Sequence, residues 1–219
     1  MTYSEKIQRI SSGIYFVTDS HLRPDLSLYD MTNIAIEAGA TTLQLRVKDI
    51  PTQELVTIAK KMNSRCKQAG IIFIVNDRVD VALASEADGV HLGPDDMHPS
   101  DARHIMGPDA IIGVSVSTID EAETIVEYAS YLGVGAIFGS STKSDAGDAV
   151  GTERITTIKS NFPMIPLVAI GGINRDNIHS VGAAGADSAA VISSVLLADD
   201  PVAMIKTLDS LWKQGRSSV

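Results

Sequence analysis

Carboxylates follow two consecutive apolar runs in the stretch NDRVDVALASEADGVHLGPDDM, which covers residues 76–97. Asp77 ends the run IIFIVND, and Asp96 comes shortly after the run GVHLG. If the two runs are neighbouring parallel strands, their carboxyl ends meet at one edge and bring the carboxylates together. Carboxylate oxygens suit Mg²⁺, which takes one or two protein carboxylates and leaves its other positions to water and phosphate oxygens. The alternative is local, because Asp77 could cap the next helix and Pro94-Asp95-Asp96 could form an ordinary turn.

Two cations lie in the apolar run before these, TTLQLRVKD, which starts at Thr41. Side chains alternate between the faces of a strand, so Gln44, Arg46 and Lys48 share one face and the apolar residues share the other. Cations that face the interior of a closed sheet are costly unless paired, so we expect a ligand with several negative charges. Arg46 can bind a phosphate through two hydrogen bonds, and Lys48 supplies a compact charge. Beside a Mg²⁺ site, these cations predict a diphosphate-binding site.

A second anion site is expected where two later apolar runs end. Gly171 and Gly172 follow the run PLVAI, and Ile192 and Ser193 follow the run SAAV. In closed barrels of alternating strands and helices, the loops after the seventh and eighth strands usually bind phosphate. Glycines let backbone N–H groups approach the oxygens, and the start of a helix favours negative charge. Taken alone, the Gly-Gly pair fits a tight turn equally well.

Three further features are expected at the same end of the strands. The polar segment SSTKSDAGDAVG, residues 140–151, is either a surface loop or a lid that closes Lys143 over the diphosphate. Ser115, which follows IIGV, is expected to reach the same place. His91 faces the interior if its two apolar neighbours face outward. We expect a hydrogen-bonded core histidine there rather than a general base.

Eight short β-branched runs alternate with helical patterns and position these residues. Alternation of this kind predicts a parallel sheet, and eight units can close it into a (β/α)₈ TIM barrel with its active site at the carboxyl ends of the strands. A doubly wound open sheet is the alternative, but no GxGxxG turn follows the first run. We expect a single α/β domain over residues 1–219. The runs begin at Gly13, Thr41, Ile71, Gly89, Ile111, Gly135, Pro166 and Ser188.

Composition limits the partners of this chain of 219 residues, whose formal net charge is −9. Hydrophobic residues make up 44% and aromatic residues only 5%, which is typical of parallel strands covered by helices. No basic run is present, so we expect no nucleic-acid partner. No apolar run approaches the ~20 residues of a membrane helix, and the polar start MTYSEKIQRISSG lacks a signal-peptide core. We therefore expect small-molecule substrates and no membrane contact, and a homo-oligomer is neither predicted nor excluded.

The chain has one cysteine, Cys66. A single cysteine excludes an intrachain disulfide and a metal cluster of cysteines. We interpret Cys66 as a small apolar residue of a helix and expect a cytoplasmic protein.

Motifs spread over most of the chain match, in order, those of a known enzyme family. They are YFVTD, QLRVK, NDRVDVALASEADGVHLGPDDM, IIGVS, the STK of the polar segment, VAIGGI and the VIS near the end, from Tyr15 to Val195. On these motifs the chain resembles the thiamine phosphate synthases. The central stretch is highly specific, whereas Gly-Gly or Ser-Thr-Lys alone would not be.

The resemblance implies a Mg²⁺-dependent transferase reaction. The family joins an aminopyrimidine methyl diphosphate to a thiazole ethyl phosphate, or to its carboxylated form, and gives thiamine monophosphate and diphosphate. Diphosphate leaves first, the amino group stabilises the resulting pyrimidine methyl cation, and the thiazole nitrogen then attacks. Catalysis of this kind needs charge stabilisation on the leaving group and no strong protein base.

The resemblance also implies a role for individual residues. Asp77 and Asp96 would hold Mg²⁺. The groups that act in catalysis would be Arg46, Lys48, Ser115 and Lys143. The pyrimidine diphosphate would be bound by Gln44, Arg46, Lys48, Asn76, Ser115 and Lys143, and the thiazole phosphate by Ser140, Ser141, Thr142, Gly171 or Gly172, Ile192 and Ser193.

Two other functions fit part of the pattern. A thiazole tautomerase resembles this family and keeps the phosphate site, but it would need neither the Mg²⁺ carboxylates nor the cationic strand. A non-catalytic protein that binds thiamine precursors is the second alternative. It is favoured by the altered loop, where Gly139 and Ser140 depart from the family pattern, and opposed by the presence of the charged site residues.

Overall fold

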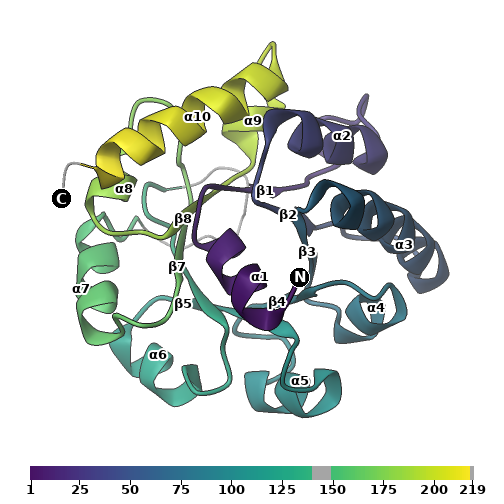
Figure 1. Ribbon diagram of the computed structural model, residues 1–219, viewed down its shortest axis with the longest axis horizontal. Coiled ribbons are helices and arrows are strands. Elements are labelled where there is room, and N and C mark those ends of the chain that lie inside the picture. Colours follow the sequence, from purple (N-terminus) through teal and green to yellow (C-terminus); the bar gives the residue numbers. More distant parts are fainter. Residues whose placement is uncertain (140–148, 218–219) are drawn as a thin grey trace.

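The computed structural model describes residues 1–139 and 149–217, which form a closed barrel of parallel strands with helices around it (Figure 1). Strands pair with their neighbours in chain order, and β1 pairs with β8 to close the sheet. The prediction of a (β/α)₈ TIM barrel is therefore confirmed. The strands are β1 (Ile14–Val17), β2 (Thr42–Leu45), β3 (Ile72–Asn76), β4 (Gly89–Leu92), β5 (Ile111–Val116), β6 (Tyr131–Val134), β7 (Leu167–Ile170) and β8 (Ser188–Val191).

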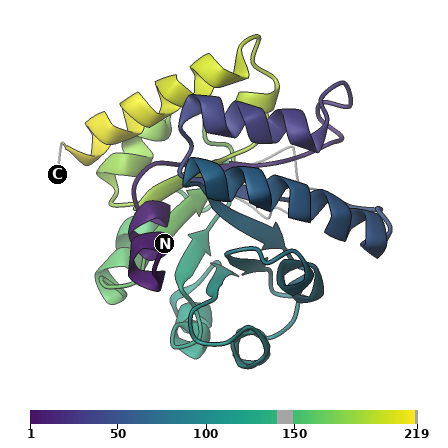
Figure 2. The ribbon, with the colours of Figure 1, turned by 45° about the vertical axis from the view of Figure 1, so that its right-hand side comes forward.

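Most helices lie on the outside of the barrel, whereas α1 lies across its amino-terminal end (Figures 1 and 2). There Tyr3, Ile7 and Ile10 of α1 pack against the side chains that fill the barrel. Within the described residues, none of the helices has the length and apolar character that a membrane span requires. The helices are α1 (Tyr3–Ile10), α2 (Leu28–Ala38), α3 (Thr52–Ala69), α4 (Val79–Ala84), α5 (Pro99–Met106), α6 (Ile119–Ile125), α7 (Glu153–Asn161), α8 (Ile178–Ala183), α9 (Ser193–Leu196) and α10 (Pro201–Arg216).

The side chains of the strands divide into two cores, because alternate residues point to opposite faces of the sheet. Outward residues such as Phe16 and Phe73 pack beneath the helices in the larger core. Inward residues such as Tyr15, Ile74 and Tyr131 fill the barrel itself. The inner core carries polar atoms on its tyrosines, so those atoms must find hydrogen-bond partners inside the barrel.

An aspartate directly before a strand has the same structural role at two places in the barrel. The Asp88 carboxylate precedes β4 and accepts a hydrogen bond from Phe73 N at 3.0 Å. The Asp187 carboxylate precedes β8 and accepts one from Leu167 N at 2.9 Å. Each aspartate also pairs with a cation, and Lys6 of α1 lies 2.9 Å from Asp88. These carboxylates fix where β3 pairs with β4 and where β7 pairs with β8.

The sixth strand lies earlier in the chain than the sequence pattern indicates. The pattern places it in GAIFGSS from Gly135, whereas the structure has β6 at Tyr131–Val134. The reason is that α6 ends at Ile125, which leaves enough chain before Tyr131 for the turn that leads into the strand. Ser130 directly precedes the strand, and its Oγ accepts a hydrogen bond from Ile112 N at 3.0 Å.

Replacing Asp88 by alanine should lower the free energy of unfolding by about 1–3 kcal/mol, because the buried Phe73 N–H loses its acceptor. Urea denaturation of Asp88→Ala and of the unaltered protein measures the difference. Asp88→Asn keeps an oxygen for Phe73 and loses only the charge facing Lys6, so its loss should be clearly smaller. Equal losses in the two variants would contradict the structural role of this hydrogen bond.

Candidate active site

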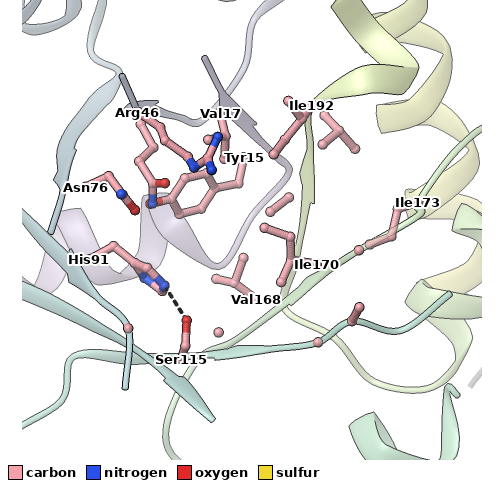
Figure 3. A pocket seen from close by; sticks show the side chains of 18 of the residues that line it. Tyr15, Val17, Arg46, Asn76, His91, Ser115, Val168, Ile170, Ile173 and Ile192 are labelled. Carbon is pink, nitrogen blue, oxygen red and sulfur yellow. Dashed lines mark hydrogen bonds between the residues drawn. The ribbon is translucent and has the colours of Figure 1, made fainter. Parts of the chain in front are cut away.

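A cavity of about 270 Å³ opens at the carboxyl ends of the strands, and all eight strands contribute to its wall. Figure 3 shows Arg46, Asn76, His91 and Ser115 on one side of it, and the side chains of Val168, Ile170 and Ile192 on the opposite side. The first side comes from β2 to β5 and is polar. The second comes from β7 and β8 and is apolar. The cavity can therefore hold a ligand with hydrogen-bonding groups against an apolar or ring-shaped neighbour.

Most of the predicted site residues that the structure describes meet in this cavity. Ser140, Ser141, Thr142 and Lys143 lie outside the described residues. The predicted residues that line the cavity are Gln44, Arg46, Asn76, Asp77, Ser115, Gly171, Gly172, Ile192 and Ser193.

Lys48 is placed differently from its prediction. The strand β2 ends at Leu45, and Lys48 is exposed in the loop that follows. Asp49 beside it has φ of 62°, a left-handed conformation that turns the chain away from the strand direction. The prediction that Lys48 shares the interior face of a strand with Gln44 is therefore wrong, and its contact with a substrate stays a prediction.

Arg46 is held at both its backbone and its side chain by residues that follow β1. Thr18 Oγ1 donates to Arg46 O at 3.1 Å and accepts from Arg46 N at 3.0 Å, which extends the pairing of β1 with β2. Arg46 Nη1 lies 3.0 Å from Asp19 Oδ2, and the two side chains are only 11% and 7% exposed. The other Asp19 oxygen accepts from the backbone N–H groups of His21 and Leu22. The guanidinium thus has a fixed position at the cavity wall.

The two predicted metal ligands stand at the ends of β3 and β4. Asp77 has φ of 63°, and its N–H donates to His91 O at 2.8 Å. A left-handed non-glycine residue persists only where its surroundings hold it, and such residues concentrate at functional sites. Asp96 Oδ2 accepts from Gly93 N at 2.7 Å, and Gly93 lines the cavity. The residues that the structure describes contain no group of three or more histidine, cysteine, aspartate or glutamate side chains around one point.

The Gly-Gly turn after β7 is required by packing against the segment after β6. Gly171 has φ of 102°, and a Cβ there would lie 2.6 Å from Ala136 Cα. Gly172 has φ of 63°, and a Cβ there would overlap Phe138 O. Any side chain at either position would push the two loops apart. The turn is therefore a point of close backbone approach at the apolar side of the cavity.

Five polar side chains form a continuous series of hydrogen bonds across the barrel, and we call them the barrel network. Gln44 Nε2 donates to Tyr15 Oη at 2.8 Å, and Tyr15 Oη lies 2.8 Å from Tyr131 Oη. Tyr131 Oη lies 2.9 Å from His91 Nδ1, and His91 Nε2 lies 3.0 Å from Ser115 Oγ (Figure 3). The expectation that His91 is a hydrogen-bonded interior histidine is confirmed. Tyr15, Tyr131 and Asp19 were not among the predicted site residues.

Glycines on two strands make room for the barrel network. A Cβ at Gly113 of β5 would overlap the Tyr131 ring, and a Cβ at Gly133 of β6 would lie 2.8 Å from His91 Cε1. Glycine inside a strand often marks such a close approach, which is the one signal in the sequence that could have indicated these rings. Burial raises the pKa of the Tyr15 and Tyr131 phenols well above their usual value, so both hydroxyls keep their protons at neutral pH.

A family model described as thiamine monophosphate synthase matches residues 14–195. The chain belongs to this family. A thiamine-phosphate synthase from Moorella thermoacetica is 43% identical over 204 residues, covering 93% of this chain and 97% of that protein. One from Haloarcula marismortui is 44% identical over 207 residues, covering 93% and 98%. The solved structure of a thiamine phosphate pyrophosphorylase from Pyrococcus furiosus is similar with a TM-score of 0.86 and 38% identity, over 94% of this chain and 98% of that one.

Asp19→Ala should lower the free energy of unfolding by about 3–5 kcal/mol, because it leaves the Arg46 guanidinium buried without its counter-charge. The double variant Asp19→Ala, Arg46→Met removes both charges and should recover most of that loss. Chemical denaturation of the two variants gives both values. A double variant as unstable as Asp19→Ala would mean that Asp19 acts through its backbone contacts and not through Arg46.

Proposed function

We propose that this member of the thiamine monophosphate synthase family joins an aminopyrimidine methyl diphosphate to a thiazole ethyl phosphate and releases diphosphate. The product would be thiamine monophosphate. The observation that carries the proposal is the two-sided cavity, in which Arg46 and the ends of β3 and β4 face an apolar wall and the Gly-Gly turn. The relatives that share 43% and 44% identity over nearly the whole chain bear names for the same activity. We propose the cytoplasm as the location, since the single cysteine leaves no intrachain disulfide to form.

The polar side of the cavity suits the pyrimidine diphosphate. Gln44 and Ser115 offer hydrogen-bonding groups to a ring, and Arg46 offers a fixed guanidinium to the diphosphate. Asn76 lines the same wall and can donate through its amide to a phosphate oxygen. The overall charge of −9 repels anions, so this local cation has to provide the attraction.

The apolar side suits the thiazole phosphate. The side chains of Val168, Ile170 and Ile192 can pack against a thiazole ring. Ser193 is the first residue of α9, and it lines the cavity after β8, the strand that pairs with the one before the Gly-Gly turn. A phosphate there would meet a hydroxyl. This layout puts the thiazole ring beside the pyrimidine ring, as the reaction requires.

The reaction would proceed by loss of diphosphate before attack. The bond between the pyrimidine methyl carbon and the diphosphate oxygen breaks, and the oxygen keeps the electron pair. Arg46 stabilises the negative charge that develops on that oxygen, and its salt bridge to Asp19 keeps it from reorienting. The thiazole nitrogen then gives its electron pair to the methyl carbon to form the new bond. No protein base is needed, because neither reactant loses a proton in forming thiamine monophosphate.

Asp77 and Asp96 fit Mg²⁺ by their chemistry. They supply two carboxylates from the ends of neighbouring strands, and Mg²⁺ usually takes one or two protein carboxylates together with water and phosphate oxygens. A zinc site would need three or four ligands rich in histidine or cysteine. When bound, Mg²⁺ would neutralise charge on the departing diphosphate.

The direct test mixes the purified protein with the two substrates and Mg²⁺. Thiamine monophosphate is then detected by oxidation to a fluorescent thiochrome, with EDTA as the control. We expect product only when Mg²⁺ and both substrates are present. Binding of both substrates without product would favour the precursor-binding alternative, and rearrangement of the thiazole phosphate alone would favour the tautomerase.

Asp77→Ala and Asp96→Ala should abolish Mg²⁺-dependent turnover while circular dichroism shows an intact fold. Asp96→Asn separates charge from structure, because an amide oxygen can still accept the hydrogen bond from Gly93 N. We expect Asp96→Asn to lose turnover as well, because it cannot hold the metal. The matched control is Asp95→Ala, which removes the exposed neighbouring carboxylate and should keep full activity. Full activity in the Asp77 and Asp96 variants would contradict the metal assignment.

Arg46→Ala should reduce kcat/KM for the pyrimidine diphosphate by roughly 10²- to 10³-fold, as the loss of one transition-state charge contact does in other enzymes. The apparent Kd of the thiazole phosphate should change less than about threefold, because its phosphate is expected at the opposite side. Steady-state kinetics and calorimetric titration measure the two quantities. Equal weakening of both substrates would contradict the two-sided layout.

A further inference from the structure

The barrel network joins two cavity-lining residues that the proposed function assigns to the same ligand. Gln44 stands at one end and Ser115 at the other, and both line the cavity. Between them Tyr15 and Tyr131 are buried, with 1% and 0% exposed surface, so water does not compete for their hydroxyls. The four donor–acceptor distances of the network fall between 2.8 and 3.0 Å. Each contact is thus a hydrogen bond of ordinary length.

The number of hydrogens in the barrel network restricts how these bonds can point. Each tyrosine hydroxyl and the serine hydroxyl carries one hydrogen, and a neutral imidazole carries one N–H. If Tyr15 donates to Tyr131, then Tyr131 must donate to His91 Nδ1. The imidazole proton is then on Nε2 and points at Ser115. If any one bond is reversed, the others must reverse with it, and both orders contain the same number of protons.

The order is set at the Gln44 end. Gln44 places its Nε2 beside Tyr15 Oη, so the amide donates and the Tyr15 hydrogen points to Tyr131. That order puts the proton of His91 on Nε2, where it donates to Ser115 Oγ. Ser115 is then left with its own hydrogen to offer to the cavity. Gln44 then keeps its carbonyl oxygen as an acceptor, beside the second hydrogen of its amide.

We propose that Tyr15, Tyr131 and His91 are positioning residues that couple Gln44 to Ser115. The Ser115 hydroxyl donates into the cavity when the Gln44 carbonyl oxygen is available there as an acceptor, and it accepts when that oxygen is turned toward Tyr15. The ligand class that fits is a ring with an N–H donor and an unprotonated ring nitrogen. An aminopyrimidine has both, on its amino group and its ring nitrogens. The identity of that ligand rests on the proposed function, whereas the coupling between the two ends does not.

The coupling can be measured without any substrate, because the tautomer of His91 reports the order of the whole barrel network. The ¹⁵N chemical shifts of a neutral imidazole distinguish Nε2–H from Nδ1–H. The protein has five histidines, and the His91 signals are those that disappear in His91→Gln. At pH 8.5 we expect His91 of the unaltered protein to be predominantly the Nε2–H tautomer.

The decisive variant is Gln44→Glu, whose ionised carboxylate can only accept a hydrogen bond. Tyr15 must then donate to Glu, Tyr131 to Tyr15, and His91 Nδ1–H to Tyr131. We therefore expect the His91 tautomer to invert, although it lies three hydrogen bonds away from the substitution. The ¹³C shift of the introduced carboxyl carbon verifies that it is ionised. An Nε2–H tautomer that persists beside the ionised carboxylate would overturn the coupling.

A break in the barrel network supplies the control. In Tyr131→Phe the ring stays and only the hydroxyl is lost, so adding Gln44→Glu should no longer change the tautomer population of His91. Tyr15→Phe breaks the network one bond earlier and should abolish the response in the same way. Tyr3→Phe removes a hydroxyl that donates to Ser130 Oγ outside the network, and the inversion should persist in that background. Inversion that survives in both the Tyr131→Phe and Tyr15→Phe backgrounds would also overturn the proposal.

Binding measurements give a second readout of the coupling. Tyr131→Phe should raise the Kd of the aminopyrimidine methyl diphosphate about tenfold, since the ends of the network lose their fixed order. The Kd of the thiazole phosphate should stay within twofold, and Tyr3→Phe should change neither value. Equal weakening of both ligands would indicate general damage to the barrel and count against a positioning role. Failure of the enzyme to make thiamine monophosphate would leave the histidine result unaffected, so the two proposals fail separately.

Discussion

The pairing of β1 with β8 is the constraint on which the other features of this protein depend. A closed sheet has no edge, so every strand ends at the same rim and every inward side chain shares one interior. Residues far apart in sequence, such as Arg46 after β2 and Ile192 after β8, then meet around one cavity. A polar atom inside such a barrel can form hydrogen bonds with water only if it lies at the rim. Tyr15 and Tyr131, which lie deeper, have to bond to each other and to their interior neighbours.

Closure also brings loops with an unusual backbone conformation together at the rim. Asp77 has a positive φ where its strand ends, and so do the two glycines after β7. Those glycines touch the backbone of the segment after β6, so loops from neighbouring strands pack directly on one another. Arg46 gains its position in a similar way, from Thr18 and Asp19 across the rim. The cavity wall is thus held by contacts between loops as much as by the strands beneath them.

The fold could be predicted from the sequence, because eight alternating runs leave few arrangements other than a closed parallel barrel. Much of the cavity wall could also be predicted, since residues that directly follow strands, such as Asn76 and Gly171, must reach its rim. Lys48 could not be placed, because strand periodicity says nothing about where β2 ends, and the strand stops at Leu45. Tyr131 was not predicted to point into the barrel, because the sequence Tyr131-Leu132-Gly133 fits the end of a helix as well as a strand. Asp19 was not predicted as a site residue, because an aspartate after a strand also fits an ordinary turn. Its salt bridge with Arg46 joins two different strand ends, and no spacing in the sequence indicates that contact.

The position of α1 gives the cavity a single entrance. Tyr3 and Ile7 fill the amino-terminal end of the barrel, so whatever enters must come and go through the opposite mouth. In the part of the chain that the structure describes, the barrel is thus a blind pocket and not a channel. A molecule that leaves the cavity has to use the same mouth as a molecule that enters it, so departure and entry exclude each other.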